Sequence, residues 1–441
     1  MERFLYDQLL AWKASGDRKP LLLQGARQVG KTFLLKEFAR REYRDCAYFN
    51  FEQDPQLGNL FGSSLSPDIL IESLSALIGR KIEPGSTLIF FDEIQESPRA
   101  ITSLKYFYEQ APEYHIVSAG SLLGVSVGKP TSFPVGKVSF MTLYPMSFFE
   151  YLVAMKENML VKRLKDHSFS FWKPLPEIFH EKLSRLFKYY LYIGGMPEVV
   201  QDYIKKKDIE NVRRLQKEIL NAYARDFSKH TSPSEAIRIS QVWRSIPTQL
   251  AKENKKFKYS EVKKGGRASR FESAIEWLRK AGLIYVVYNI KVPKLPLSSY
   301  ADDSKFKIYM LDSGLLGALL NVPSRVIILG DSLFSQYSGA FVENFVSQEF
   351  WVHIDSGEIY YWTSNSEAEV DFIVPIGSEI FPLEVKGGLS RRTKSLRVYA
   401  ARYNPQGIFR TSPRNFTRDG DFTNIPLYAI SLLPTLPPAV V

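Results

Sequence analysis

Along the first 150 residues, short runs of consecutive apolar residues alternate with longer segments in which apolar residues recur at helical spacing. Short apolar runs occur in PLLLQG, CAYFNF, TLIFFDE and HIVSAGS, and helical spacing follows the first three, at residues 31–43, 65–79 and 98–110. Short apolar runs are typical of strands that are buried on both faces, and their alternation with helices indicates a parallel sheet covered by helices. We therefore predict an α/β domain over residues 1–150.

The pattern changes after this region. Residues 151–235 read as long amphipathic helices in HEKLSRLFKYYLYIGGMPEVVQDYI and IENVRRLQKEILNAYARDFSKH, which predicts a helical lid or connector. Residues 236–325 give a helix, a basic turn, a second helix and the apolar run GLIYVVYNI, the order of a winged helix-turn-helix. Residues 326–441 begin with a helix and three strand patterns, which predicts a further α/β domain.

The first apolar run is followed by a phosphate-binding pattern. The stretch fits G-x-x-x-x-G-K-[ST] with Gly25, Ala26, Arg27, Gln28, Val29, Gly30, Lys31 and Thr32. The glycines let the backbone curl so that its N–H groups face the phosphates, and the next helix adds its positive N-terminal end. Lys31 would contact the phosphates and Thr32 would bind Mg²⁺. The alternative is an ordinary glycine-rich turn.

Acidic and polar residues occur at the ends of two other predicted strands, TLIFFDE and HIVSAGS. Asp92 follows the apolar residues of TLIFFDE, where a carboxylate can complete the Mg²⁺ shell, and Glu93 can act as general base on the attacking water. A helix N-cap with an acid in the first turn explains either residue alone, but not their pairing with the glycine-rich loop. Ser118 or Ser121 in HIVSAGS is a candidate γ-phosphate contact; equally, the strand simply ends in small polar residues.

Five segments together resemble a known family: QGARQVGKT, FFDEIQ, SAGSLLG, FPVGKVSFMTLYPMSFFEYL and YLYIGGMPEVV. They are similar to the bacterial and archaeal AAA-type ATPases that carry a C-terminal restriction-endonuclease-like domain of unknown function, and the resemblance extends to about residue 400. It implies an ATPase in which residues 25–32 contact ATP and Asp92 and Glu93 form the second acidic motif. Many relatives have arginine where this chain has Lys137, so an arginine-finger role does not transfer, because lysine lacks the planar fork.

The amino-acid composition limits the class of protein to which the chain can belong. With 45% hydrophobic and 14% aromatic residues among 441, the chain belongs with folded multidomain proteins. Its single cysteine, Cys46, excludes an internal disulfide and a cysteine-built zinc site, which fits a reducing compartment. The N-terminal segment is amphipathic and charged, and no long apolar run occurs, so we expect a cytoplasmic protein without a membrane partner.

The net charge of +11 suggests a polyanionic partner. Residues 252–270 hold eight lysines and arginines against two glutamates, and residues 386–397 hold five without an acid. Basic residues around the second helix of a helix-turn-helix neutralise DNA phosphates, so the first segment is a candidate DNA contact. A solvated lysine-rich turn, or a winged helix that packs against protein, accounts for the same pattern.

The C-terminal region has its own carboxylates. Glu343 falls on a helix, Asp371 falls in a β-rich run, and Glu384 and Lys386 are two residues apart, so their side chains share one face of a strand. This is the order of a PD-(D/E)XK nuclease site, in which carboxylates hold Mg²⁺ and the lysine assists the attacking water. A cross-strand ion network between Asp371, Glu384 and Lys386 explains the same residues.

We therefore expect an ATP-binding protein, a Mg²⁺-dependent ATPase that couples hydrolysis to conformational change and acts on DNA. One alternative is an ATP-gated endonuclease that uses the C-terminal site. Another is a nucleotide-sensing scaffold in which an inactive nuclease-like domain binds a partner. A homo-oligomer or a protein partner fits each of these functions.

Overall fold

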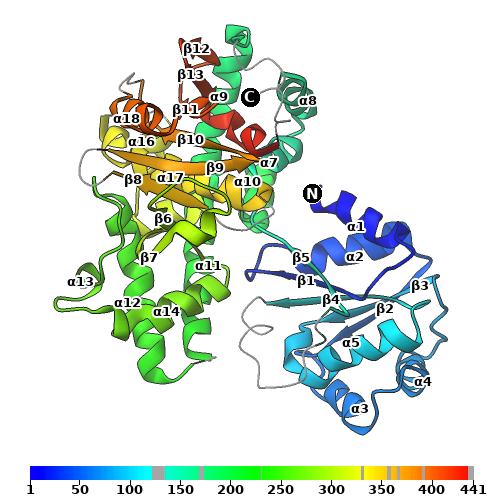
Figure 1. Ribbon diagram of the computed structural model, residues 1–441. Coiled ribbons are helices and arrows are strands. Elements are labelled where there is room, and N and C mark those ends of the chain that lie inside the picture. Colours follow the sequence, from blue (N-terminus) through cyan, green and yellow to red (C-terminus); the bar gives the residue numbers. More distant parts are fainter. Residues whose placement is uncertain are drawn as a thin grey trace. The chain divides into compact units, whose positions relative to one another are not determined.

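The chain folds into two compact units in the computed structural model (Figure 1). One comprises Met1–Tyr144 and Lys280–Gly282, and the other comprises Pro145–Arg279 and Leu283–Val441. The structure describes residues 1–121, 134, 136–167, 173–229, 231–328, 332–354, 359–364, 368–389 and 393–435. None of the helices in these ranges is both long enough and apolar enough to cross a lipid bilayer.

The first unit contains a five-stranded parallel sheet with the order β2-β3-β4-β1-β5. Its strands are β1 (Leu21–Gly25), β2 (Asp45–Asn50), β3 (Thr87–Asp92), β4 (His115–Ser121) and β5 (Ser139–Thr142). Its helices are α1 (Leu5–Ala14), α2 (Lys31–Glu42), α3 (Leu57–Ser63), α4 (Pro67–Ile78), the short 3-10 turn η1 (Ile94–Glu96) and α5 (Pro98–Gln110). Helices α1 and α2 cover one face of the sheet, and α3, α4 and α5 cover the other (Figure 1).

The apolar runs of the sequence form the centre of this sheet. Every residue of β3 is buried, and Phe91 packs with Phe61 of α3 and Leu104 of α5 in one core cluster. Local signals set the helix ends: the Ser97 side chain accepts the Ala100 N–H at the start of α5, and Gly79 in the left-handed region ends α4. The sheet thereby holds the carboxyl ends of β1, β3 and β4 at one edge.

The second unit begins with helices and continues into a mixed sheet. The helices are α7 (Phe148–Ala154), α8 (Asn158–His167), α9 (Glu177–Ile193), α10 (Pro197–Lys206), α11 (Ile209–Lys229), α12 (Pro233–Leu250), α13 (Tyr259–Val262) and α14 (Ala268–Lys280). Within HEKLSRLFKYYLYIGGMPEVVQDYI the sequence indicated continuous helix, whereas the structure has two helices. Gly194, with a φ of 77°, ends α9, and Pro197 begins α10.

The sheet of the second unit has eight strands in the order β12-β13-β11-β10-β9-β8-β6-β7. They are β6 (Ile284–Ile290), β7 (Ala301–Met310), β8 (Tyr360–Thr363), β9 (Glu369–Ile376), β10 (Glu379–Val385), β11 (Ile408–Ser412), β12 (Thr417–Asp419) and β13 (Phe422–Pro426). The accompanying helices are η2 (Leu297–Tyr300), α15 (Ser313–Leu319), α16 (Ser324–Ile328), α17 (Ser332–His353), α18 (Lys394–Tyr403) and η3 (Leu427–Thr435).

Strand β6, which the sequence suggested as a wing, is an inner strand of this sheet. It pairs antiparallel with β7 and parallel with β8, which belongs to the C-terminal part of the chain. Strand β9 is antiparallel to both β8 and β10, and β10 is parallel to β11. One sheet therefore joins residues that the sequence pattern assigned to two regions.

Candidate nucleotide-binding site

The glycine-rich loop lies between the end of β1 and the start of α2. A Cβ atom at Gly25 would come within 2.3 Å of the Leu143 carbonyl oxygen, so only glycine fits there. Gln28 and Gly30 have φ values of 66° and 96°, which turn the chain into the N-terminus of α2. Arg3 supports the loop, because its guanidinium donates to the Val29 carbonyl at 3.0 Å. Nothing near Arg3 in the sequence indicated this contact.

The Lys31 ammonium is held inside the loop. Its Nζ donates to the carbonyl oxygens of Gly25 and Ala26, at 3.0 and 2.9 Å. Burial lowers the pKa of Lys31 from 10.5 to about 8, although the nearby carboxylates of Glu93 and Asp92 oppose this shift. The loop thus carries a cation whose charge an incoming anion would stabilise.

Thr32 and Asp92 meet although they lie on different elements. The Thr32 hydroxyl donates to Asp92 Oδ1 at 3.1 Å, and the Tyr48 hydroxyl donates to Asp92 Oδ2 at 2.8 Å. Strand β3 is not the immediate neighbour of β1, because β4 lies between them. The side chains of α2 and β3 nevertheless bring a hydroxyl and a buried carboxylate together, and these are oxygen donors that Mg²⁺ accepts.

Glu93 lies next to this pair in an unusual backbone conformation. Its φ of 51° is in the left-handed region, where a residue with a side chain costs about 1–3 kcal/mol. Gln95 Nε2 donates to Glu93 Oε2 at 2.6 Å, and the Glu93 N–H donates to Asp92 Oδ1 at 3.2 Å. The Asp92 side chain thus pairs with Thr32 and Tyr48, whereas the Glu93 side chain pairs with Gln95, so the two neighbouring acids are suited to different roles.

Strand β4 places Ser121 level with the start of the loop. Ser121 pairs in register with Gly25, whereas Ser118 pairs with Leu22 inside the strand. Both serines are buried, and the Ser118 hydroxyl has no hydrogen-bond partner among the described residues. The register favours Ser121 over Ser118 as the residue nearer to a bound phosphate. Residues 122–133, which include the end of SAGSLLG, lie outside the described residues.

A family model described as an AAA domain matches residues 17–152. The region of the first unit that matches this model is called the AAA domain below. Two further models, both described as domains of unknown function, match residues 184–326 (DUF8612) and 338–430 (DUF4143). The fold and the family match of the AAA domain therefore agree with the phosphate-binding pattern in its sequence.

Several solved structures resemble the chain at a distance. The ORC1 protein of Aeropyrum pernix in complex with DNA is 14% identical over 72% of this chain and 91% of that one, with a TM-score of 0.29. AMPPCP-bound DnaA of Aquifex aeolicus is 15% identical over 63% and 86%, with a TM-score of 0.28. PCH-2 of C. elegans is 12% identical over 47% and 64%, also with a TM-score of 0.28, so the chain spans under two thirds of PCH-2. No curated protein matches the chain.

Lys137 of the AAA domain is engaged within its own unit. Its Nζ pairs with Glu109 of α5 at 3.2 Å and lies 5.3 Å from the centroid of the Tyr108 ring. Glu109 and Tyr108 are therefore structural partners of Lys137.

The four residues of the nuclease-like pattern fall in two groups. Glu343 on α17 and Asp371 on β9 both approach Lys307 Nζ, at 3.8 and 3.6 Å. Glu384 on β10 pairs with Lys386 at 2.6 Å, and its second oxygen, Oε2, is buried without a hydrogen-bond partner among the described residues. Lys386 lies one residue beyond the strand, which ends at Val385. The expected ion network between Asp371, Glu384 and Lys386 is therefore not formed as one group: Glu384 pairs with Lys386, whereas Asp371 pairs with Lys307.

These residues do not fit a Mg²⁺ ion as they stand. Within the described ranges, no group of three or more histidine, cysteine, aspartate or glutamate side chains is arranged to hold a metal. Glu343 Oε2 accepts the Tyr309 hydroxyl at 3.0 Å, and its Oε1 pairs with Lys255. Asp371 Oδ2 accepts the Val385 N–H at 2.9 Å. Both oxygens of Glu343 and Oδ2 of Asp371 are therefore already used by protein donors, and among these carboxylates only Glu384 keeps a buried oxygen, Oε2, without a donor from the described residues.

Proposed function

We propose that the protein is a Mg²⁺-dependent ATPase that binds ATP at residues 25–32 and couples its hydrolysis to a conformational change. The observation that carries this proposal is the 3.1 Å hydrogen bond between Thr32 and Asp92. It joins the phosphate loop to the acidic strand where both oxygens can face one metal ion. The match to the AAA domain model supports the same conclusion.

Each residue of the site has a distinct role in this proposal. Backbone N–H groups of residues 25–32 bind the phosphates, and Lys31 stabilises the negative charge that develops on the γ-phosphate. Thr32 and Asp92 would hold Mg²⁺, which would supply positive charge to stabilise the phosphates. Glu93 accepts hydrogen bonds from the attacking water and orients it, and Ser121 contacts the γ-phosphate.

The lowered pKa of Lys31 makes ATP affinity depend on pH. Below pH 8 the lysine of the free protein is already charged. Above pH 8 it is neutral in the free protein, and bound phosphates raise its pKa, so binding takes up a proton. The affinity should then fall by up to about tenfold per pH unit. Calorimetric titration of a non-hydrolysable analogue at pH 9, in two buffers of different ionisation enthalpy, measures the uptake. Lys31→Arg is the control, because arginine stays charged, and zero uptake by wild type would contradict the prediction.

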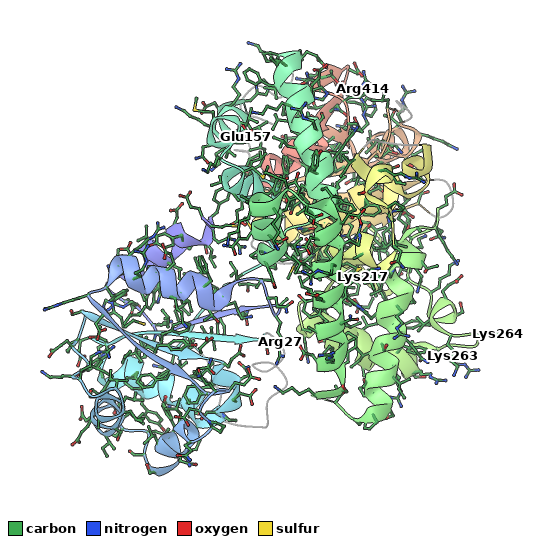
Figure 2. The ribbon with its side chains drawn as sticks, turned by 180° about the vertical axis from the view of Figure 1, so that it is seen from behind. Arg27, Glu157, Lys217, Lys263, Lys264 and Arg414 are labelled. Carbon is green, nitrogen blue, oxygen red and sulfur yellow. The ribbon has the colours of Figure 1, made fainter. Side chains whose placement is uncertain are left out.

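We propose DNA as the object of the conformational change. Lys263, Lys264 and Arg267 are exposed in the turn between α13 and α14, and they form no ion pair with the described residues. The side chains of Lys263 and Lys264 extend away from the ribbon (Figure 2). Gly266 makes the turn tight, because a Cβ there would lie 2.3 Å from the Tyr259 carbonyl oxygen. The exposed charge is smaller than the sequence suggested. Lys252, Lys255 and Lys256 are neutralised by Glu261, Glu343 and Glu369.

The experiment compares ATP turnover with and without single- and double-stranded DNA. Alanine at Lys263, Lys264 and Arg267 should abolish DNA stimulation and leave basal turnover unchanged. It should also lower the salt dependence of DNA binding by about 0.9 per lost phosphate contact for duplex DNA. The matched control removes the same charge from exposed helical positions, with alanine at Lys205, Lys206 and Lys217. If neither single-stranded nor double-stranded DNA changes the rate of ATP turnover, the result would favour a nucleotide-sensing scaffold.

Two further assignments are part of the proposal. The order α12, α13, α14 supports the helix-turn-helix part of a winged-helix arrangement for residues 236–325, although β6 joins the larger sheet. The order α17, β8, β9, β10 supports a nuclease-like fold for residues 326–441. We place the AAA domain at residues 1–150 and the helical connector at 151–235. A cytoplasmic location is likewise part of the proposal.

A further inference from the structure

A buried lysine lies at the centre of the carboxylate group in the second unit. Lys307 of β7 is 1% exposed, and its Nζ lies 2.6 Å from Glu369 Oε1, 3.6 Å from Asp371 Oδ1 and 3.8 Å from Glu343 Oε2. The ammonium is also 5.0 Å from the centroid of the Tyr361 ring. Burial disfavours its charge, but Tyr309 and the three carboxylates outweigh this effect and raise the pKa of Lys307 well above its usual value. The lysine is therefore charged.

Two more lysines complete the group from a different segment. Lys255, between α12 and α13, pairs with Glu343, and its neighbour Lys256 lies 3.9 Å from Glu369. Three ammonium groups thus face three carboxylates, so their formal charges balance. A divalent cation added to this group would have to displace ammonium groups that are already in contact with the same oxygens, at an electrostatic cost.

We propose that Lys307 and Lys255 permanently occupy the place of a metal among Glu343, Glu369 and Asp371. The group is then an ionic core that fastens β7 and the segment around Lys255 to α17 and β9. It is not a metal-dependent centre for cleaving phosphodiesters. This inference is independent of the proposed ATPase function, because it concerns only residues of the second unit.

The elements that the core joins explain why charges are buried here. Lys255 and Lys307 belong to the region matched by one model of unknown function, and Glu343, Glu369 and Asp371 belong to the region matched by the other. The sheet makes the same connection, because β6 pairs with β8. Buried ion pairs add little net stability compared with apolar packing, but they specify a single arrangement of their partners, as we propose here. The two regions should therefore move as one body.

The first test measures Mn²⁺ binding to the full chain by electron paramagnetic resonance, without nucleotide. We expect Asp371→Asn and Glu343→Gln to leave the amount of bound Mn²⁺ equal to that of wild type. Plasmid DNA incubated with wild type, ATP and Mn²⁺ should stay supercoiled. Wild-type Mn²⁺ binding that either substitution abolishes would overturn the proposal, and so would nicking that Asp371→Asn abolishes.

The second test uses thermal unfolding. Lys307→Met leaves buried carboxylates uncompensated, so we expect the melting temperature to fall by roughly 5 °C or more. Adding Asp371→Asn removes one of those charges, so the double variant should melt higher than Lys307→Met alone. Lys305→Met, at an exposed position of the same strand, is the matched control and should melt as wild type does. An unchanged melting temperature for Lys307→Met, or additive losses in the double variant, would show that the lysine does not neutralise the group.

Discussion

Replacing Glu93 with glutamine is expected to slow ATP turnover by roughly 10²- to 10⁴-fold and to leave ATP affinity nearly unchanged. In the proposed mechanism, the Glu93 carboxylate accepts a proton from the attacking water, and a neutral amide cannot do so. Glu93 is not part of the loop that would bind the phosphates, and the hydrogen bond between Thr32 and Asp92 stays in place. The substitution therefore removes a contribution that matters only in the transition state.

The matched control for this variant is Glu96→Gln. Glu96 has the same charge, is exposed and lies at the end of the same short helix, so its loss should change turnover little. Steady-state hydrolysis and equilibrium binding of a labelled nucleotide separate the two parameters. Equal turnover by Glu93→Gln and wild type would remove Glu93 from the mechanism. A large loss of affinity would instead assign it a role in holding the nucleotide.

The sequence was sufficient to predict most of the AAA domain because its strands are locally distinctive. β1, β3 and β4 each contain a short apolar run, and α5 begins and ends where the helical spacing does. Strand β5 had no such signal. Within Ser139–Thr142, three residues are partly buried and Phe140 is exposed, and the four become a strand because they pair with β1. Pairing of that kind is a property of the folded chain.

Contacts distant in sequence account for what was missed at the nucleotide site. The loop pattern identified residues 25–32, and the end of an apolar run identified Asp92 and Glu93. Arg3 and Tyr48, which hold Val29 and Asp92, are separated from them by 26 and 44 residues. No spacing rule connects such positions, so they become visible only in three dimensions.

The contacts of Lys307 in the second unit could likewise not be predicted from the spacing of residues in the sequence. The order of Glu343, Asp371, Glu384 and Lys386 suggested a nuclease-like site, but nothing in that pattern pointed to Lys307. In the structure, Lys305 is exposed and Lys307 is buried, although both lie on the same strand and both are lysines. Lys307 is buried among carboxylates of α17 and β9, two elements that come later in the sequence.

The segment after α9 passes through a space that only glycine fits. Gly195 fits between the Met146 backbone and the Asp312 side chain. Its N–H donates to Asp312 Oδ2 at 2.5 Å, and its carbonyl accepts the Met146 N–H at 2.7 Å. A Cβ atom there would come within 2.1 Å of the Met146 carbonyl oxygen. Asp312 is fully buried, and its other oxygen accepts the Leu315 N–H at the start of α15. One glycine thereby holds three parts of the second unit together.

Alanine at Gly195 should therefore destabilise the second unit by about 3 kcal/mol or more. Rotation of a side chain cannot relieve a contact between a Cβ and a backbone oxygen, so the chain has to move and the hydrogen bonds to Asp312 and Met146 weaken. Calorimetric scans of the full chain should show an unfolding transition that is lowered by roughly 6 °C or more. Gly388→Ala is the control in the same unit, because a Cβ there meets nothing within 4 Å. If Gly195→Ala melts like this control, the backbone around Met146 must yield easily, and the double glycine would then serve only to separate α9 from α10.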